Sequence, residues 1–317
     1  MSDYAIGVDL GGTNLRVATI HKSGVIMERL SVAAEVHEGP DSLLGRIGAT
    51  VNQAIDQLKI KGQEPVGVGI GVPGIIRMDR GFVEDAPNLG WTNLPVREHL
   101  EEILRCTVIL ENDANAAALG EKWMGSGQGT NHLCLVTLGT GVGGGFIMDG
   151  KIWHGFRGMA GEVGHVNIYP DGVACNCNGQ GCLEQYASAK AIVREAEKAA
   201  RKGLSLKLRH ELDRSGKLTA KTVGHQARQG DNVAQAIYAD VGKALGIALG
   251  TIMNLLELPL FLLSGGVAAA WDLFAPAMFA QLEKGAYMYR TGGIRVESGK
   301  LEEDAGLFGA AYLPFCK

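Results

Sequence analysis

A pattern that occurs twice constrains this chain most: an apolar strand, a turn rich in glycine and threonine, and a second strand. In residues 4–20, an apolar run ends at Gly11-Gly12 and a second run follows. Residues 133–148 repeat this order around Gly139-Thr140-Gly141. Short apolar runs bounded by glycine are typical of buried strands. The repeat therefore predicts two related α/β halves.

The rest of the chain alternates between strand and helix patterns. Pro40 opens a run with apolar residues at a helical period, and Asp231 is a candidate N-cap for a long apolar helix that ends near residue 256. Further strands are expected at 25–32, 66–72, 107–111 and 258–263, and further helices at 96–104, 113–123, 187–202, 271–284 and 305–313. Strands that alternate with helices predict an α/β architecture.

The composition is that of a globular protein of about two domains, since 317 residues exceed the usual single-domain size. Glycine is unusually frequent, at 46 residues, which predicts turns or close backbone approach to a ligand. The net charge of −4 argues against a dedicated nucleic-acid or anionic-membrane partner.

The N-terminus shows no basic segment followed by an apolar one. The most apolar stretches, residues 244–256 and 258–271, are shorter than a membrane span. These features predict a cytoplasmic enzyme with no membrane partner.

Two segments, residues 69–74 and 139–144, match the G-x-G-x-x-G pattern of dinucleotide sites. Each is followed by apolar residues typical of another strand, whereas the dinucleotide motif opens a helix. The chain also has no G-x-x-x-x-G-K-[ST] sequence. We therefore expect neither a dinucleotide site nor a P-loop.

Three glycine turns at strand ends are stronger candidates for a phosphate site. In the first, Gly11 and Gly12 leave backbone N–H groups open to an anion, while Thr13 and Asn14 add short hydrogen-bond donors. Asp9, at the end of the preceding strand, could hold Mg²⁺ through its waters. The second turn contains Thr140 and Gly141, and the third contains Gly265 and Gly266. The alternative is three tight turns without a ligand, but together they favour a nucleotide.

Asp113 lies in Glu111-Asn112-Asp113-Ala114-Asn115, where a strand is expected to meet a helix. One interpretation is that Asn112 or Asp113 simply caps the helix. The other is that Asp113 orients an acceptor hydroxyl for phosphoryl transfer, where the hydroxyl proton can leave late. The two roles are compatible.

Three cysteines fall within eight residues, and a histidine precedes them. His165, Cys175, Cys177 and Cys182 supply four soft ligands, enough for a tetrahedral zinc with no position left for water. We therefore predict a structural zinc that braces the loop carrying Glu162 and Glu184. Reduced surface cysteines and a disulfide are the alternatives.

Five segments together resemble the ROK family of bacterial sugar kinases and repressors, and most of all its glucokinases. They are residues 9–16, 111–115, 162–165, 175–184 and 264–267. The resemblance implies an actin-like ATPase (ribonuclease H-like) α/β fold with a cleft between two domains. The small domain would comprise residues 1–112 plus about 302–317, and the large domain residues 113–301 with the zinc loop.

The resemblance also implies roles for single residues. Asp113 matches the family's catalytic base. The residues that match the family's sugar ligands are Gly74, Asn88, Asn112, Glu162, His165 and Glu184. The residues that match its ATP-Mg²⁺ side are Asp9, Gly12, Thr13, Thr140, Gly265 and Gly266. The family usually has glycine where this chain has Asn178, and asparagine tolerates the left-handed backbone that such a turn needs.

The implied activity is ATP-dependent phosphorylation of the 6-hydroxyl of an aldohexose, with glucose favoured. A homodimer or homotetramer is also implied. Kinases for fructose, allose, mannose or N-acetylmannosamine would use the same residue types. A non-catalytic protein on this fold would not need Asp113 together with the sugar ligands. A repressor would need a DNA-binding segment before the first strand, which begins by Tyr4 here.

Overall fold

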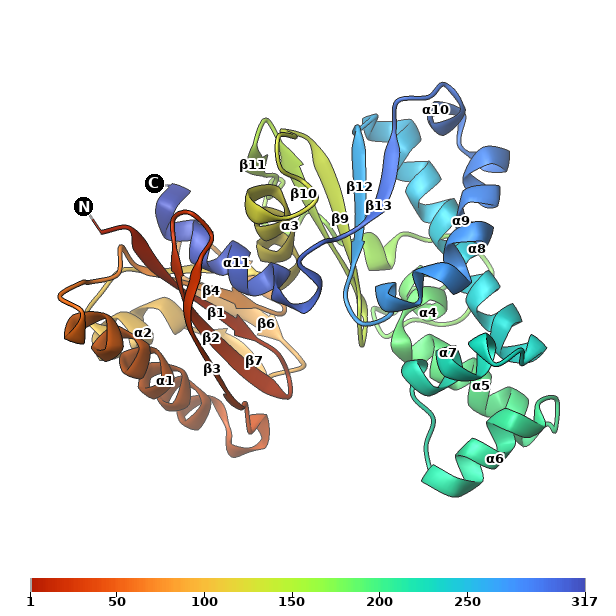
Figure 1. Ribbon diagram of the computed structural model, residues 1–317, viewed down its shortest axis with the longest axis horizontal. Coiled ribbons are helices and arrows are strands. Elements are labelled where there is room, and N and C mark those ends of the chain that lie inside the picture. The colour runs from red at the N-terminus through yellow and green to blue at the C-terminus, as the bar shows by residue number, and fades with distance from the viewer. Residues whose placement is uncertain (1, 317) are drawn as a thin grey trace. The chain divides into compact units, whose positions relative to one another are not determined.

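The computed structural model describes residues 2–316 (Figure 1) and divides into two compact units. The first unit comprises Met1–Leu135, Gly145–Gly161 and Gly299–Lys317, and the second comprises Val136–Gly144 and Glu162–Ser298. The first unit therefore extends past the boundary expected at residue 113. The physical reason is that α3 (Asp113–Met124) packs against α11 (Ala305–Tyr312). The domain boundaries and the cleft that the family resemblance implies stay predictions.

The first unit contains a five-stranded sheet in the order β3-β2-β1-β4-β8. β1 pairs antiparallel with β2 and parallel with β4, and β4 pairs parallel with β8. The strands are β1 (Tyr4–Leu10), β2 (Asn14–His21), β3 (Ile26–Ala33), β4 (Val68–Val72) and β8 (Val108–Asn112). All five were expected from the sequence, with ends that differ by at most two residues.

The two faces of this sheet are covered by different helices. Ile6 and Val8 belong to the buried core that includes the apolar face of α1 (Pro40–Ile60) and α2 (Val96–Leu104). Gly7 and Gly69 lie on the opposite face, where a Cβ on either would fall within 2.3 Å of an α11 carbonyl oxygen. The alternating glycines of β4 therefore allow a helix to lie directly on the strand backbone, which confirms the close packing expected there.

Helices α3 and α11 approach each other through glycine as well. A Cβ on Gly309 would lie 1.6 Å from the Ala116 oxygen, and one on Gly120 would lie 2.1 Å from the Ala305 oxygen. Real side chains never come so near, so only glycine fits at these crossings. Part of the glycine excess thus serves helix packing, which the composition alone did not predict.

A small antiparallel sheet, not anticipated from the sequence, lies between β4 and α2 in the chain. Its strands, in the order β5-β6-β7, are β5 (Ile75–Arg77), β6 (Phe82–Ala86) and β7 (Trp91–Leu94). Gly74 precedes β5 with φ at +119°, and a Cβ there would lie 2.3 Å from the Asp85 oxygen. The turn into this sheet therefore requires glycine.

The second five-stranded sheet has the order β11-β10-β9-β12-β13. Its strands are β9 (Leu133–Leu138), β10 (Val142–Met148), β11 (Lys151–Ile152), β12 (Leu260–Ser264) and β13 (Arg295–Ser298). The order matches that of the first sheet, with β9 and β10 in the places of β1 and β2, and so supports the expected repeat. β10 begins four residues earlier than expected because the Gly139 N–H donates to the Gly141 oxygen and closes a short turn.

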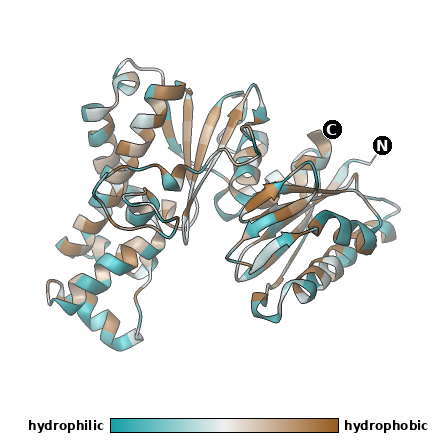
Figure 2. Ribbon diagram, turned by 180° about the vertical axis from the view of Figure 1, so that it is seen from behind, coloured by the Kyte–Doolittle hydropathy of each residue, from teal (hydrophilic) through white to brown (hydrophobic). Residues whose placement is uncertain are grey.

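Besides β12, β13 and parts of β9 and β10, the second unit contains helices. Asp231 caps the long helix as expected, since its carboxylate accepts from the Ala234 N–H at 2.8 Å. The single helix expected at 187–202 is divided at Ser188, which caps the second part. The helices are α4 (Glu184–Ala187), α5 (Ala189–Arg201), α6 (Leu206–Ser215), α7 (Ala220–Arg228), α8 (Asn232–Leu256), α9 (Trp271–Gly285) and α10 (Tyr287–Arg290). Figure 2 shows hydrophobic strands and hydrophilic stretches along helices such as α6.

Helix α8 is long and apolar enough to cross a membrane by length and composition, because the helix begins well before the apolar stretch seen in the sequence. In the structure, 61% of its most apolar window is buried. Burial of that kind is typical of the core helix of a globular protein.

Candidate functional site

Asp113 is the first residue of α3, at the point where β8 ends. The helix is capped by Asn112, whose Oδ1 accepts from the N–H groups of Ala114 at 3.0 Å and Asn115 at 3.1 Å. The Asp113 carboxylate accepts from the Ala114 N–H at 2.9 Å. The capping role therefore falls to Asn112, and the first turn of α3 holds Asp113 where the positive end of the helix favours a carboxylate.

Two more of the expected sugar-side residues lie in the first unit. The Asn112 side chain donates from Nδ2 to the Gly74 oxygen at 3.2 Å, so β8 and the turn before β5 are joined next to Asp113. Asn88 is exposed in the turn between β6 and β7, and a Cβ on Gly12 would lie 3.6 Å from its backbone oxygen. The structure thus brings together Gly74 with Asn112, and Asn88 with Gly12.

The first glycine turn connects β1 to β2. The Gly11 N–H donates to the Asn14 oxygen at 2.9 Å, and the Thr13 oxygen accepts from Ala34 at 2.9 Å. Arg16 binds the Asp9 carboxylate through Oδ2 and also donates to the Glu303 backbone oxygen at 2.7 Å. Asp9 is thus held at the strand end by an ion pair that the sequence did not predict.

The second and third glycine turns meet within the second unit. The Leu138 oxygen accepts from the Val267 N–H at 3.0 Å, and a Cβ on Gly265 would lie 2.7 Å from the same oxygen. Gly265 also has φ at +91°. In contrast, a Cβ on Gly139 or Gly266 would meet nothing within 4 Å. The last two glycines therefore leave open backbone, as a ligand would require.

A cavity of about 530 Å³ opens beside Thr140. Its walls come from α5, the start of α7 and the segment before α7. Its walls combine apolar side chains with two threonines and three charged residues, a mixed lining that suits a flat heterocycle with a polar substituent. The lining residues are Thr140, Ala189, Lys190, Val193, Arg194, Glu197, Leu218, Thr219 and Ala220.

Glu184, the first residue of α4, also lies against the second glycine turn. Its Oε2 accepts from the Val142 N–H at 3.0 Å, and a Cβ on Gly141 would lie 2.4 Å from that oxygen. A residue expected on the sugar side therefore contacts a turn expected on the nucleotide side. Gly141 is needed for this contact, in addition to any ligand.

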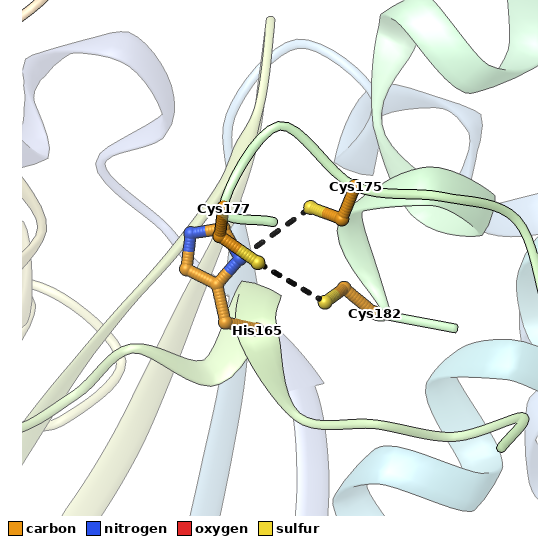
Figure 3. Close-up of side chains that lie close together, drawn as sticks. All are labelled: His165, Cys175, Cys177 and Cys182. Carbon is orange, nitrogen blue, oxygen red and sulfur yellow. Dashed lines mark hydrogen bonds between the residues drawn. The ribbon is translucent and has the colours of Figure 1, made fainter. Parts of the chain in front are cut away.

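The cysteine–histidine cluster assembles as expected (Figure 3), with all four ligand atoms within 4.8 Å of one another. His165 Nδ1 lies 3.7 Å from Cys175 Sγ, and Cys177 Sγ lies 3.6 Å from Cys182 Sγ. A tetrahedral zinc places neighbouring sulfur and nitrogen ligands about 3.5–3.8 Å apart. The sulfur separation is far longer than the ~2.0 Å of a disulfide. The four side chains therefore fit a Cys₃His zinc.

The environment of the cluster acts on its cysteines in opposite directions. A hydrogen bond from the Gly179 backbone lowers the pKa of Cys177, which favours the thiolate that binds metals, whereas burial raises the pKa of Cys182 to about 12. Asn178 has φ at +66°, the left-handed conformation expected for it. His165 turns its other nitrogen, Nε2, toward Glu162 at 4.0 Å. A carboxylate therefore lies within ion-pair distance of the nitrogen that a metal would leave free.

No sequence motif indicates the contact between Glu111 and His154. Glu111 lies in the strand before Asp113, and only 3% of its side chain is exposed. Its Oε2 lies 2.8 Å from His154 Nε2. The two residues are 43 positions apart, so no local pattern could have paired them.

The candidate residues thus fall into two sets, each described within its own unit. The first unit holds Asp9, Gly11, Gly12, Thr13, Asn14, Gly74, Asn88, Asn112 and Asp113. The second unit holds Thr140, Gly141, Glu162, His165, Cys175, Cys177, Cys182, Glu184, Gly265 and Gly266.

The sequence signature of the ROK family matches residues 5–315. The chain belongs to the ROK family. It is 36% identical over 315 residues to a glucokinase of Halalkalibacterium halodurans, covering 99% of this chain and 96% of the relative. The family expected from the five sequence segments is therefore confirmed.

Similarity to a solved structure extends over the whole chain. The structure of a ROK family glucokinase from Streptomyces griseus in complex with glucose and AMPPNP matches with a TM-score of 0.83 and 33% identity, covering 99% of this chain and 100% of that one. This match confirms the expected actin-like ATPase fold.

The family is not confined to kinases. A putative xylose repressor of Caldicellulosiruptor is 30% identical over 304 residues, which cover 96% of this chain and 76% of the repressor. The repressor therefore shares the ROK region with this chain but is longer than the shared region.

Proposed function

We propose that the protein is an ATP-dependent hexokinase that phosphorylates the 6-hydroxyl of an aldohexose, with glucose as the first candidate. The observation that carries the proposal is the full-length similarity to a glucokinase whose structure holds glucose and an ATP analogue. The arrangement at the N-terminus of α3 supports the same reaction, because it holds a carboxylate where an acceptor hydroxyl could be oriented.

On the nucleotide side, the open backbone at Gly139 and Gly266 would face the phosphates, and the cavity beside Thr140 would take the adenosine. Gly265 would shape the third glycine turn. The first glycine turn is formed by Gly11, Gly12, Thr13 and Asn14. Asp9, whose Oδ2 accepts from Arg16, would hold Mg²⁺ through its waters. Magnesium would neutralise charge on the phosphates.

On the sugar side, the proposed ligands are side chains and backbone groups that suit hydroxyls. Carboxylates accept two hydrogen bonds per oxygen, and the amide of Asn112 both donates and accepts. A site of this kind rejects sugars that lack the matching hydroxyl, because its polar groups would be left unpaired. The ligands are Gly74, Asn88, Asn112, Asp113, Glu162, His165 and Glu184.

In the mechanism, Asp113 accepts a hydrogen bond from the 6-hydroxyl and aims its oxygen at the γ-phosphorus. The bond between the sugar oxygen and phosphorus forms as the bond between phosphorus and the ADP oxygen breaks. The hydroxyl proton passes to Asp113 late, because the transition state of phosphoryl transfer is loose. Asp113 therefore acts mainly by orientation.

The cysteine–histidine cluster would hold a structural zinc. Four protein ligands close the coordination sphere, so the metal would brace the segment 162–184 rather than bind substrate. Bound through Nδ1, His165 would keep Nε2 for a sugar hydroxyl or for Glu162.

A panel of hexoses assayed with ATP, each for kcat/KM, tests the proposal. Glucose should give the highest value, with fructose, allose, mannose and N-acetylmannosamine lower. A different best sugar would replace glucose but keep the kinase. No turnover with any sugar would overturn the kinase and favour a sugar-binding protein without catalysis or a DNA-binding regulator, which sugar and DNA binding measurements would separate.

We further propose that the protein is cytoplasmic and forms a homodimer or homotetramer. Light scattering of the purified protein gives its mass in solution, to be compared with the 33.5 kDa of one chain. A monomer at assay concentration would contradict the oligomer.

A further inference from the structure

The Glu111 side chain is almost fully buried. It lies near the end of β8, the strand that leads to Asp113. Its Oε1 accepts from the Asn112 N–H at 2.9 Å and from the Asn115 side-chain amide at 3.1 Å. One carboxylate oxygen therefore binds the residues on both sides of Asp113.

These contacts continue into the rest of the junction. Asn112 caps α3 and donates to the Gly74 oxygen, and the Asn115 side chain is buried beneath the first turn of the helix. A shift of the Glu111 carboxylate would therefore move the cap, the amide of Asn115 and the turn before β5 together. Asn112 and Asn115 flank Asp113 in the chain, and the turn before β5 is held to the same junction by Asn112.

His154 supplies the contact at the other oxygen of Glu111. It follows β11, and Gly155 with φ at +69° turns the chain directly after it. Its Nε2 lies 2.8 Å from Glu111 Oε2, and 37% of its side chain is exposed. A Cβ on Gly158 would lie 3.3 Å from the Ile76 oxygen, so the segment after His154 runs along β5 as well.

The electrostatics favour a charged pair. A buried carboxylate without a cation or hydrogen-bond donors is costly. The hydrogen bond to Glu111 raises the pKa of His154, against the lowering effect of burial. A protonated imidazole would donate to Oε2 while the two amide groups donate to Oε1, so both oxygens would be held by charge-assisted bonds.

We propose that His154 is a positioning residue for phosphoryl transfer, which acts by holding Glu111 so that the β8–α3 junction presents Asp113 in one orientation. This proposal rests on the proposed kinase function. His154 itself need not touch sugar or ATP. Displacement of a reacting group by about 1 Å can cost a hundredfold in rate, so a small relaxation of the junction is enough for a measurable effect.

The experiment compares His154→Ala with the conservative His154→Gln, whose amide can still donate to Glu111. His132→Gln is the matched control, because His132 is also a histidine near a carboxylate, Asp149, at 3.6 Å, but this carboxylate is 93% exposed whereas that of Glu111 is buried. For each protein, kcat and the two KM values are measured with ATP and the best hexose. Exchange of the Asn112 amide hydrogen is measured in parallel.

We expect His154→Ala to lower kcat about 10–100-fold, with KM for ATP within about twofold, and to speed Asn112 exchange. His154→Gln should recover most of the kcat, and His132→Gln should match the wild type. A kcat for folded His154→Ala within twofold of wild type would overturn the proposal. So would equal losses in the alanine and glutamine variants.

Two further outcomes keep the test decisive. If His154→Ala does not fold, Glu111→Gln replaces it, since this change keeps the size of the side chain and removes the charge that holds His154. Unchanged kcat in folded Glu111→Gln would then overturn the proposal. If the wild type phosphorylates no hexose, the proposed function fails, and Asn112 exchange decides alone whether His154 holds the junction.

Discussion

The two five-stranded sheets share a strand order but differ in what lies at the strand ends. In the first sheet, β1 and β8 end in the polar groups Asp9, Asn112 and Asp113. In the second, β9 and β12 end in glycine turns with open backbone at Gly139 and Gly266. Both copies thus carry a glycine turn at a strand end, and the first copy adds the carboxylates of Asp9 and Asp113. The proposed reacting group therefore belongs to the first copy, whereas the proposed phosphate site draws on glycine turns of both.

The sharpest test of this difference is Asp113→Asn. The change keeps the size of the side chain but weakens its power to orient and deprotonate a hydroxyl, so kcat should fall by about 10²–10⁴-fold. Sugar binding and the melting temperature should change little. Asp79→Asn, at an exposed carboxylate, is the control and should keep full activity. Turnover of Asp113→Asn near the wild-type value would contradict the role of Asp113.

The second copy also carries the cysteine–histidine cluster, which the first lacks among the described residues. Cys175→Ser should abolish stoichiometric zinc and lower the melting temperature by about 5–10 °C. The reason is that each kcal/mol lost from the free energy of unfolding lowers the melting temperature by about 2–4 °C, and loss of the metal removes a few kcal/mol. Zinc content by elemental analysis and calorimetry measure both. Cys316→Ser, at an exposed cysteine outside the cluster, should change neither. Wild-type protein purified without zinc and equally stable would rule out a structural metal.

The backbone cradle is tested by two neighbouring glycines. Gly265→Ala should destabilise the protein by about 1–3 kcal/mol, because its φ is positive and its Cβ would meet the Leu138 oxygen. Gly266→Ala has room and should stay within about 0.5 kcal/mol of wild type. It should nevertheless raise KM for ATP about tenfold if phosphate approaches there. Denaturant unfolding and ATP titration measure the two effects, and an unchanged KM in Gly266→Ala would remove the third turn from the proposed ATP site.

The smallest expected effect is a pH dependence of stability that arises from the pair of Glu111 and His154. The pKa of His154 is raised in the folded protein above the ordinary value of 6.5. Protonated His154 therefore contributes stability below pH 6.5, and this contribution is lost as pH rises through its higher folded pKa. The effect is small because the side chain is partly exposed. Stability curves of wild type and Glu111→Gln should converge as pH rises above 6.5, and parallel curves would show that the pair does not titrate.

Local features of the sequence predicted much of this structure. Strand ends at glycine pairs, the Asp231 cap and the left-handed Asn178 each depend on a few neighbouring residues. The cluster of His165 with three cysteines was predictable because metal ligands have few other uses at such spacing. The alternating glycines of β4 predicted close backbone packing, but they did not predict which helix covers the strand.

Contacts between distant segments were not predictable in the same way. Glu111 with His154 and Glu184 with Gly141 arise only when separate strands and loops are brought together. The helices α6 and α7 and the sheet β5-β6-β7, all built from segments of ten residues or fewer, were also missed. In the candidate site, residue identities came from motifs, whereas the contacts that hold those residues came from the fold.

Transfer of labelled phosphate to sugar tests the central claim most directly. ATP labelled in its γ-phosphate is incubated with glucose and the wild-type protein or Asp113→Asn, and the labelled product is identified by phosphorus NMR. We expect glucose 6-phosphate from the wild type, almost none from Asp113→Asn, and no labelled sugar when 6-deoxyglucose replaces glucose. Label found only in inorganic phosphate, or on 6-deoxyglucose, would contradict that claim.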